Sequence, residues 1–459
     1  MTKALRKCFA VRFKELNRWS VGSFREIGWR WPAEYIRPLS DALIRKLFDV
    51  EKKSVDPKSL KLMTLHFDGE MELRHQDRNK PIKGRLWWAN PGDVIYSKID
   101  VRHGAIGIVP PELGRVCVTS EFPVYKVDSA FFDAQYIKLL FRTTSFQNKV
   151  NSMISGASGR KLVQPADLES IQVPLPPLIV QKTIVSAWEQ AKVEVADIQR
   201  RISELGVQIE IDFLASLGLS KPEQIDLPNV FSLKWSDLNR WSIEYIKRNL
   251  SEAKAERHKY PLHLLCDLCN GQSGSTPSKR NKNFWNGKIP WVSPKDMKAD
   301  WITGTINHIS DDALDSVGIS IIPQGSVLVV VRSGILQHKV PIAVNMVEVT
   351  INQDIRAFTP KPDAPISADF LAIYLRCMQH KLLSQVKWST TVQSINKESI
   401  ETIEIPLPPL DMQKRLVEKV YSQRKIIAQL KAEADQKKQH AKADVEAMIL
   451  GIKPVPDAN

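Results

Sequence analysis

Basic and hydroxyl side chains that lead up to aromatic residues are the part of this sequence best suited to bind an anionic partner. One cluster runs up to Trp87-Trp88 and another up to Phe284-Trp285. Lysine and arginine neutralise phosphates, serine and threonine hydrogen-bond to a nucleic-acid backbone, and arginine, lysine and glutamine can read base edges in the major groove. Each residue alone is more often a solvated surface residue, so the prediction of nucleic-acid contact depends on the set. Its members are Lys80, Lys83, Arg85, Lys98, Arg102, Arg160, Lys161, Ser275, Thr276, Lys279, Arg280, Lys282, Arg332, Lys339, Thr390, Thr391 and Gln393.

The net charge of the chain points the same way. With 65 Lys and Arg against 51 Asp and Glu, the formal charge is +14. This excess suggests a polyanionic partner, with nucleic acid ahead of an anionic membrane surface. The apolar run at 326–331 has only the length of a strand, so no segment is expected to cross a bilayer. The tryptophans are expected in the core more than as platforms on which bases stack.

Cys266 and Cys269, with His263 nearby, form the best candidate for a metal site. Two thiolates and an imidazole suit zinc, but a closed zinc site needs four ligands, and no second cysteine pair follows. His258 supplies a fourth ligand only if the chain folds back. The sequence therefore favours cysteines that pack as small apolar side chains, with no metal bound.

Catalytic motifs are not apparent in the sequence. We find no phosphate-binding loop and no dinucleotide fingerprint. Residues 90–93, Asn-Pro-Gly-Asp, are close to the Asn-Pro-Pro-aromatic motif of amino-methyltransferases, but they lack its second proline and its aromatic residue. A β-turn is the better interpretation. The acidic residues near the predicted strands form no obvious nuclease cluster, although spacing alone does not exclude one.

The element that must position these side chains is a proline-rich segment that occurs twice. Pro-Leu-Pro-Pro-Leu at 174–178 is followed by Gln181-Lys182, and the same letters at 406–410 are followed by Gln413-Lys414. Proline fixes φ and has no N–H donor, so each copy is extended and a helix can begin only after it. We call each copy a joint.

Two other landmarks repeat in the same order. Leu-Asn-Arg-Trp-Ser at 16–20 returns at 238–242, and Leu-Gly-Leu-Ser-Lys-Pro at 217–222 returns as Leu-Gly-Ile-Lys-Pro at 450–454. The chain is therefore predicted to be two copies of one unit of roughly 215 residues, with the pseudo-two-fold symmetry of a dimer.

Apolar residues follow each joint at alternating steps of four and three, the heptad pattern of paired helices. This predicts two long helices that pair antiparallel, each roughly 50 Å long at about 35 residues. In the alternative, each helix packs only on its own domain. The seam is predicted first at Ile184, Trp188, Ala191, Val195, Ile198, Ile202, Leu205 and Ile209, then at Leu416, Val420, Gln423, Ile427, Leu430 and Ala434, weakening at Lys437.

The segments between these landmarks are predicted to be α+β. Short β-type runs are followed by a helical stretch at 134–150 in the first copy and 367–386 in the second. Ordinary hydrophobic content, 43% of 459 residues, allows each half its own core. The expected divisions are residues 1–170, 171–220, 221–402 and 403–459. Five scattered cysteines and no secretory signal favour the cytoplasm.

The doubled joint before a long helix closely resembles the specificity subunits of type I restriction–modification systems. The stretch 273–297, SGSTPSKRNKNFWNGKIPWVSPKDM, also resembles the start of that family's target-recognition domain. The first half lacks the Thr-Pro-Ser opening and matches only from about Phe132 onward. Different interiors are expected if the two domains recognise different DNA sequences.

The resemblance implies a non-catalytic subunit that binds a bipartite DNA site. Residues 1–170 and 221–402 would be target-recognition domains. The antiparallel coiled coil would separate them and dock the methyltransferase subunits, of which two are expected. Motor/nuclease subunits would join that complex. S-adenosylmethionine, ATP and magnesium would be used by those partners and not by this chain.

Two other functions remain open from the residues alone. A stand-alone DNA-modifying enzyme would turn over without partners. A coiled-coil protein scaffold with incidental charge would bind DNA without the steep salt dependence that phosphate contacts produce.

Overall fold

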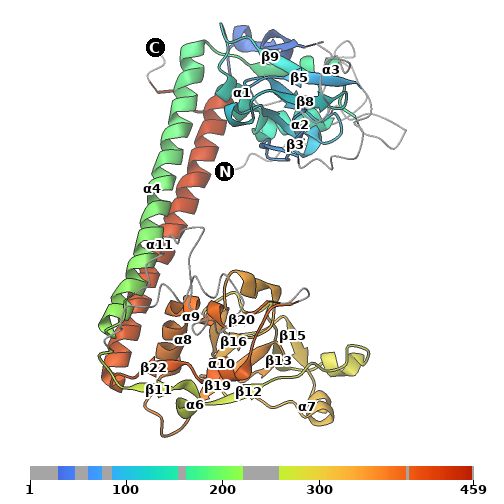
Figure 1. Ribbon diagram of the computed structural model, residues 1–459. Coiled ribbons are helices and arrows are strands. Elements are labelled where there is room, and N and C mark those ends of the chain that lie inside the picture. The colour runs from blue at the N-terminus through green and yellow to red at the C-terminus, as the bar shows by residue number, and fades with distance from the viewer. Residues whose placement is uncertain are drawn as a thin grey trace, which may run out of the picture. The chain divides into compact units, whose positions relative to one another are not determined.

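The computed structural model describes residues 29–46, 60–74, 85–152, 162–220, 258–388 and 392–456. Both Leu-Asn-Arg-Trp-Ser copies lie outside these ranges. The chain divides into two compact units: unit 1 is residues 1–198 with 432–459, and unit 2 is residues 199–431. Each long helix contributes one part to each unit (Figure 1).

Unit 1 contains a four-stranded antiparallel sheet in the order β2-β9-β6-β7. Strands β6 and β7 are buried throughout, which explains why the sequence shows apolar runs there. Three further pairs, β1-β10, β3-β4 and β5-β8, are also antiparallel. The strands are β1 (Ile36–Pro38), β2 (Leu43–Arg45), β3 (Met63–Leu65), β4 (Met71–Leu73), β5 (Leu86–Ala89), β6 (Val94–Tyr96), β7 (Ile106–Ile108), β8 (Val116–Thr119), β9 (Val124–Val127) and β10 (Gln172–Pro174).

The helical stretch predicted at 134–150 is two helices rather than one. The Asp133 carboxylate caps the first by accepting from the backbone N–H of Gln135 (2.8 Å), and the Thr143 hydroxyl caps the second by accepting from that of Phe146 (3.2 Å). The helical elements are α1 (Ala134–Phe141), α2 (Thr144–Ser152), α3 (Pro165–Glu169), and the 3₁₀ turns η3 (Ala33–Tyr35), η4 (Leu39–Asp41), η6 (Val101–His103) and η7 (Pro111–Leu113).

Unit 2 has a five-stranded sheet in the order β12-β19-β16-β17-β14 and a three-stranded sheet in the order β15-β13-β18. The strand predicted at 326–331 is β16, which has a neighbour on each side and is buried along its length. The strands are β11 (Leu262–Leu264), β12 (Cys269–Ser273), β13 (Ile289–Val292), β14 (Trp301–Ile302), β15 (Asn307–Ile309), β16 (Val327–Val330), β17 (Ile342–Asn345), β18 (Thr350–Ile351), β19 (Ile355–Pro360), β20 (Val386–Lys387), β21 (Ser394–Ile395) and β22 (Glu404–Pro406).

The helical stretch predicted at 367–386 is also divided, and its last residue belongs to β20. The Ser367 hydroxyl caps its first helix by accepting from the backbone N–H of Phe370 (3.2 Å). The helical elements of unit 2 are α6 (Leu265–Leu268), α7 (Asp311–Val317), α8 (Ala368–Cys377), α9 (Gln379–Ser384), α10 (Lys397–Glu401), and the 3₁₀ turns η9 (Lys282–Trp285) and η10 (Gly334–Gln337).

Each joint continues a short strand that is paired in the same way in both units. In unit 1, β10 pairs antiparallel with β1, and the backbone N–H of Leu175 donates to the carbonyl of Tyr35 (2.7 Å). In unit 2, β22 pairs antiparallel with β11, and the backbone N–H of Leu407 donates to the carbonyl of Pro261 (3.0 Å). The extended geometry predicted for the prolines is confirmed.

A fully buried glutamine fastens each joint to its domain. Gln181 Nε2 donates to the carbonyls of Pro176 (2.7 Å) and Phe131 (3.3 Å), and its Oε1 accepts from the backbone N–H of Asp133 (2.9 Å). The side chain thereby joins the start of the long helix to the cap of α1.

Gln413 repeats this arrangement in unit 2. Its Nε2 donates to the carbonyls of Pro408 (2.8 Å) and Pro365 (2.7 Å), and its Oε1 accepts from the backbone N–H of Ser367, the cap of α8 (3.0 Å). The repeated glutamine of the sequence motif is thus a buried three-bond staple.

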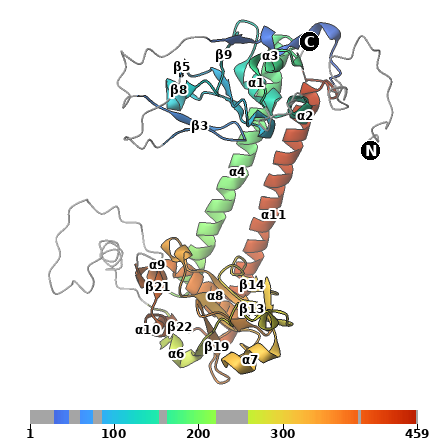
Figure 2. The same cartoon turned by 90° about the vertical axis from the view of Figure 1, so that its right-hand side faces the viewer.

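The predicted long helices are α4 (Leu178–Ser216) and α11 (Leu410–Ile449). Every predicted seam position is buried or half-buried. In unit 1, Ile184 of α4 shares a core cluster with Val445 of α11, and in unit 2, Ile209 of α4 shares one with Leu416 of α11. Within each unit the two helices lie side by side (Figure 1, Figure 2). The start of one helix meets the end of the other, so antiparallel pairing is confirmed.

The seam does not stop at Lys437, where the heptad pattern weakens. Lys437 is half-buried at a seam position and its ammonium lies 2.9 Å from Glu194 of α4. The apolar seam then resumes at Val445 and Met448. A lysine fits there because its stem can pack while its charge pairs at the rim.

Both long helices end at the glycine of the repeated Leu-Gly landmark, which lies in the left-handed region. Gly218 has φ +79° and Gly451 has φ +72°. In each case the next residue donates back to the helix, from Leu219 N–H to the Leu214 carbonyl (2.9 Å) and from Ile452 N–H to the Ala447 carbonyl (2.8 Å). This six-to-one bond is the Schellman ending, which favours glycine. No helix among the described residues is long and apolar enough to span a membrane.

Candidate nucleic-acid interface

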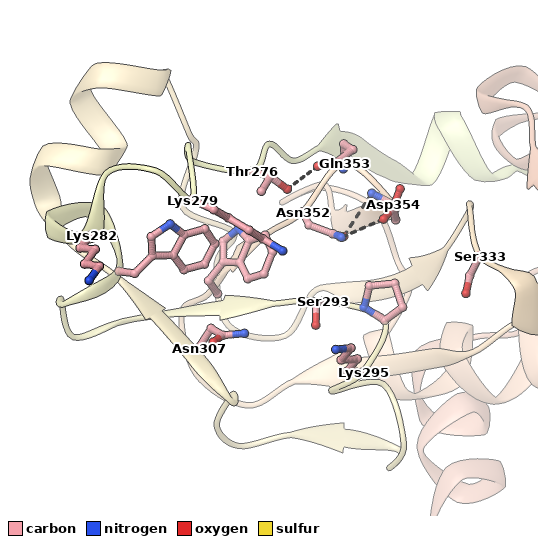
Figure 3. A pocket seen from close by; sticks show the side chains of 13 residues that line it. Thr276, Lys279, Lys282, Ser293, Lys295, Asn307, Ser333, Asn352, Gln353 and Asp354 are labelled. Carbon is pink, nitrogen blue, oxygen red and sulfur yellow. Dashed lines mark hydrogen bonds between the residues drawn. The ribbon is translucent and has the colours of Figure 1, made fainter. Parts of the chain in front are cut away.

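Unit 2 contains a cavity of about 700 Å³ that gathers several of the predicted nucleic-acid contacts. Thr276, Lys279 and Lys282 line it, together with residues from β13 and from the turn between β18 and β19 (Figure 3). The full lining is Thr276, Lys279, Lys282, Trp285, Trp291, Ser293, Pro294, Lys295, Asn307, Ser333, Asn352, Gln353 and Asp354.

Two tryptophans form an apolar wall of this cavity. The Trp285 and Trp291 rings meet edge to face, with centroids 4.9 Å apart. The Trp291 indole N–H donates to the carbonyl of Ser275 (3.1 Å), and that of Trp285 donates to the carbonyl of Ser278 (3.2 Å). Trp291 is buried, as predicted for the tryptophans, while Trp285 is half-buried. Their hydrogen bonds hold the 275–278 loop in place.

The loop that carries Ser275 and Thr276 is closed onto the end of β18. The backbone N–H of Ser275 donates to the carbonyl of Ile351 (3.0 Å). At Gly274 a Cβ atom would lie 1.8 Å from that same carbonyl oxygen, so no larger residue fits without movement. Close backbone packing therefore explains the glycine of the Ser-Gly-Ser-Thr-Pro-Ser stretch.

Residues 352–354 form a turn that its own side chains fix. The Asn352 amide donates to the Asp354 carboxylate (3.1 Å), and the backbone N–H of Asp354 donates to Asn352 Oδ1 (3.1 Å). Arg332, one of the predicted contacts, lies 3.6 Å from Asp354 and is more than half exposed. The turn therefore holds a predicted basic residue at the edge of the cavity.

Gln353, at the centre of this turn, was missed by sequence reasoning. Its side chain is exposed and its Oε1 accepts a hydrogen bond from the Thr276 hydroxyl. Figure 3 shows the two side chains pointing toward each other. No pattern in the sequence singles out an isolated exposed amide, because it depends on a contact across 77 residues.

Three lysines make the cavity a basic surface. Lys279, Lys282 and Lys295 line it, and all are exposed. Lys295 is a further residue that sequence reasoning missed. Arg280 and Lys339 are exposed too but do not line the cavity. Exposed ammonium groups at an open cavity suit a phosphate-bearing ligand.

Gln393 is not placed as a surface contact. It is only 5% exposed, and its backbone carbonyl accepts from the N–H of Ser333 (3.1 Å). The small polar loop suggested exposure, but this residue directly precedes β21, which pairs with β20. The expectation that the Gln393 side chain lies at the surface is therefore corrected. Thr390 and Thr391 lie outside the described residues.

In unit 1 the structure places three of the predicted contacts. Arg85 is exposed, Lys98 is half-buried, and Arg102 lines a cavity of about 560 Å³ beside His103 and Arg142. Lys80, Lys83, Arg160 and Lys161 lie outside the described residues.

Arg142 in this second cavity has a structural role. Its guanidinium donates to the carbonyls of Phe67 (3.1 Å), Gly104 (2.8 Å) and Ile106. Burial lowers the pKa of Arg142 below its ordinary value. The Arg142 guanidinium hydrogen-bonds to three loop carbonyls within unit 1, so we assign it a role in holding these loops together.

The candidate metal ligands do not gather into a site. His263 is exposed on β11, whereas Cys269 is buried at the start of β12. Burial raises the pKa of the Cys269 thiol to about 12, which disfavours the thiolate that zinc requires. Across the part of the chain that the structure describes, no three His, Cys, Asp or Glu residues are grouped to hold a metal ion.

The Asn-Pro-Gly-Asp segment is a turn, as predicted. The backbone N–H of Asp93 donates to the carbonyl of Asn90 (3.0 Å), and the Asp93 carboxylate accepts from the backbone N–H of Asn90 (2.7 Å). Lys46 lies 2.5 Å from the same carboxylate. These bonds close the turn that connects β5 to β6.

Comparison with known proteins identifies one domain family in unit 2 and α11. The family described as type I restriction modification DNA specificity domain matches residues 264–436. This range covers the cavity of unit 2, the second joint and much of α11.

Two curated relatives match parts of the chain. The specificity subunit of the type I restriction enzyme EcoR124I/EcoR124II of Escherichia coli is 35% identical over 155 residues, 34% of this chain and 38% of that protein. The specificity subunit of the type I restriction enzyme MjaIX of Methanocaldococcus jannaschii is 26% identical over 180 residues, 39% of this chain and 40% of that protein. The chain thus spans about two fifths of the length of each relative.

A solved structure extends the likeness in fold to most of the chain. It is described as showing complex assembly and conformational transition of the type I R-M system. The match has a TM-score of 0.56 at 17% identity and covers 90% of this chain and 96% of that one. The arrangement of two α+β domains with a long helix pair is therefore a known fold.

Proposed function

We propose that the chain is a specificity subunit of a type I restriction–modification system, the DNA-recognition subunit of such a complex. Each α+β domain would bind one half of a bipartite site in double-stranded DNA. The observation that carries this proposal is the repeated frame of joint, buried glutamine and long helix, which carries two domains that share a main sheet order but differ in their further strands.

The DNA surface of the second domain is proposed at the cavity with the tryptophan wall. Its exposed lysines supply charge for phosphates, and its hydroxyl and amide groups supply hydrogen bonds for the backbone and for base edges. The formal charge of +14 favours the same partner.

The partners of this subunit are proposed to be methyltransferase subunits, two in number, and motor/nuclease subunits. The long helices would dock the methyltransferases, and their exposed apolar residues, such as Val193 and Ile426, are suited to such contacts. S-adenosylmethionine, ATP and magnesium would be used by those partners, in the cytoplasm, and this subunit would catalyse no step.

The experiment that tests the proposal is a map of methylated positions in a host carrying this subunit with its methyltransferase. We expect a bipartite motif with a fixed gap that disappears when this subunit is deleted. The purified subunit alone should transfer no label from S-adenosylmethionine to DNA. Transfer by the subunit alone, or methylation that persists without it, would contradict the proposal.

A further inference from the structure

The Asn352–Asp354 turn presents one exposed amide at the cavity of unit 2, that of Gln353. The backbone around it is held at several points. Asn352 N–H donates to the carbonyl of Val292 (3.0 Å), and Ile355 N–H donates to the carbonyl of Asn352 (3.2 Å). Gln353 therefore projects from a rigid support, which lowers the entropy lost when it binds.

The amide itself is oriented by Thr276. Because the Thr276 hydroxyl donates to Oε1, the side chain is held by a hydrogen bond from a second loop (Figure 3). A carboxamide oxygen has two lone pairs and its nitrogen two hydrogens, so an acceptor and donors remain for a ligand. This pattern of one acceptor beside one donor matches the N6 and N7 edge of adenine.

The residues around Gln353 suit phosphate contacts, whereas Gln353 itself suits a contact to a base. Lys279, Lys282 and Lys295 carry the charges that phosphates require. A neutral amide adds little to phosphate binding, but in a major groove it discriminates between base pairs. The carboxylate of Asp354 next to it is already occupied by Asn352 and faces Arg332.

We propose that Gln353 is a base-reading residue of the second domain, contacting an adenine in its half-site, and that Thr276 positions the amide. This inference rests on the proposed function and adds to it the residue and the base. It predicts that one position of one half-site depends on a single exposed side chain.

The test is Gln353→Ala in the complete complex, with methylated positions mapped across the genome beside wild type. We expect the half-site read by the second domain to relax at one A·T pair, with discrimination there falling about 5- to 140-fold. The other half-site and the gap should not change. Gln353→Glu should shift the same position toward C·G, since a carboxylate accepts from the cytosine amino group.

The matched control is Lys279→Ala, which removes a charge from the same cavity. It should weaken methylation uniformly at all sites and relax no base. Because both side chains are exposed, thermal unfolding of both variants should match wild type.

Three outcomes would overturn the inference. They are a uniform loss in Gln353→Ala with no relaxed position, an unchanged motif, or relaxation at a G·C pair. Each would leave the proposed function intact. By contrast, a wild-type complex that yields no bipartite motif would show that the proposed function itself is wrong.

Discussion

Gln181 in unit 1 and Gln413 in unit 2 make the same three hydrogen bonds, whereas the strands added around the main sheet differ between the two units. Each glutamine ties two carbonyls and the cap of a domain helix to the start of a long helix. The main sheets share one antiparallel strand order, β2-β9-β6-β7 in unit 1 and β12-β19-β16-β17 in unit 2. Unit 2 adds β14 to this sheet and has a separate three-stranded sheet, β15-β13-β18, whereas unit 1 has the strand pairs β3-β4 and β5-β8. The likeness therefore reaches from the joint into the main sheet, and the difference lies in the strands and loops around it.

This difference has a physical reason. At each joint, buried backbone carbonyls near the prolines and the start of the helix need hydrogen-bond donors. Few side chains can donate two hydrogen bonds and accept one in that space, and glutamine is one of them. A surface that reads DNA has no such single solution, because its loops must match a particular base sequence. A protein that recognises two different DNA half-sites is therefore expected to have equivalent joints and dissimilar DNA-binding loops.

The largest expected effect is a loss of stability that is confined to unit 2. Arg356 is 4% exposed, pairs with Glu401, and donates to Ser273 Oγ (2.8 Å) and the Gly271 carbonyl (3.2 Å). Arg356→Met leaves the Glu401 carboxylate without its buried partner, and we expect a loss of about 3–5 kcal/mol in the free energy of unfolding. Hydrogen exchange should rise across β12 and β19, with unit 1 unaffected. Faster exchange in both units would contradict independent cores.

The next effect tests the equivalence of the two joints. Gln413→Leu and Gln181→Leu each leave two carbonyls and one N–H unsatisfied in a buried place, and we expect each to lose about 3 kcal/mol or more. The loss should appear in hydrogen exchange of unit 2 for the first and of unit 1 for the second. Exposed Lys414→Ala and Lys182→Ala are the controls and should cost less than about 0.5 kcal/mol. Clearly unequal losses would mean that the two staples are not equivalent.

A smaller effect distinguishes the end of α11 from an ordinary glycine ending. At Gly451 a Cβ atom would lie 2.9 Å from the backbone carbon of Arg30, whereas at Gly318, φ +67°, after α7, it would meet nothing within 4 Å. Gly318→Ala should cost only the left-handed strain of about 1–2 kcal/mol, and Gly451→Ala should cost more. Urea unfolding of the two variants measures the difference. Equal losses would show that the 30–31 segment moves aside freely.

The sequence was sufficient to predict the frame, since its signals are local. Proline excludes helix whatever its surroundings, heptads show which face is buried, and glycine marks the helix ends. It was insufficient where distant residues decide the outcome. Thr143 caps a new helix within a continuous helical pattern, Gln393 is buried although it lies in a polar loop, and Thr276 holds Gln353 in place. Such features depend on tertiary contacts, and the spacing of residues along the sequence does not indicate them.

The smallest effect concerns the helix pair, which both units share. Lys419 lies 3.0 Å from Asp212 in unit 2, and Lys437 lies 2.9 Å from Glu194 in unit 1. Both pairs are accessible to solvent, so Lys419→Ala should cost at most about 0.5 kcal/mol, and less still at 1 M salt. Lys437 also packs its stem at a seam position, so Lys437→Ala should retain part of its loss at high salt. Urea unfolding at two salt concentrations separates charge from packing, and identical salt responses would remove this last distinction between the two units.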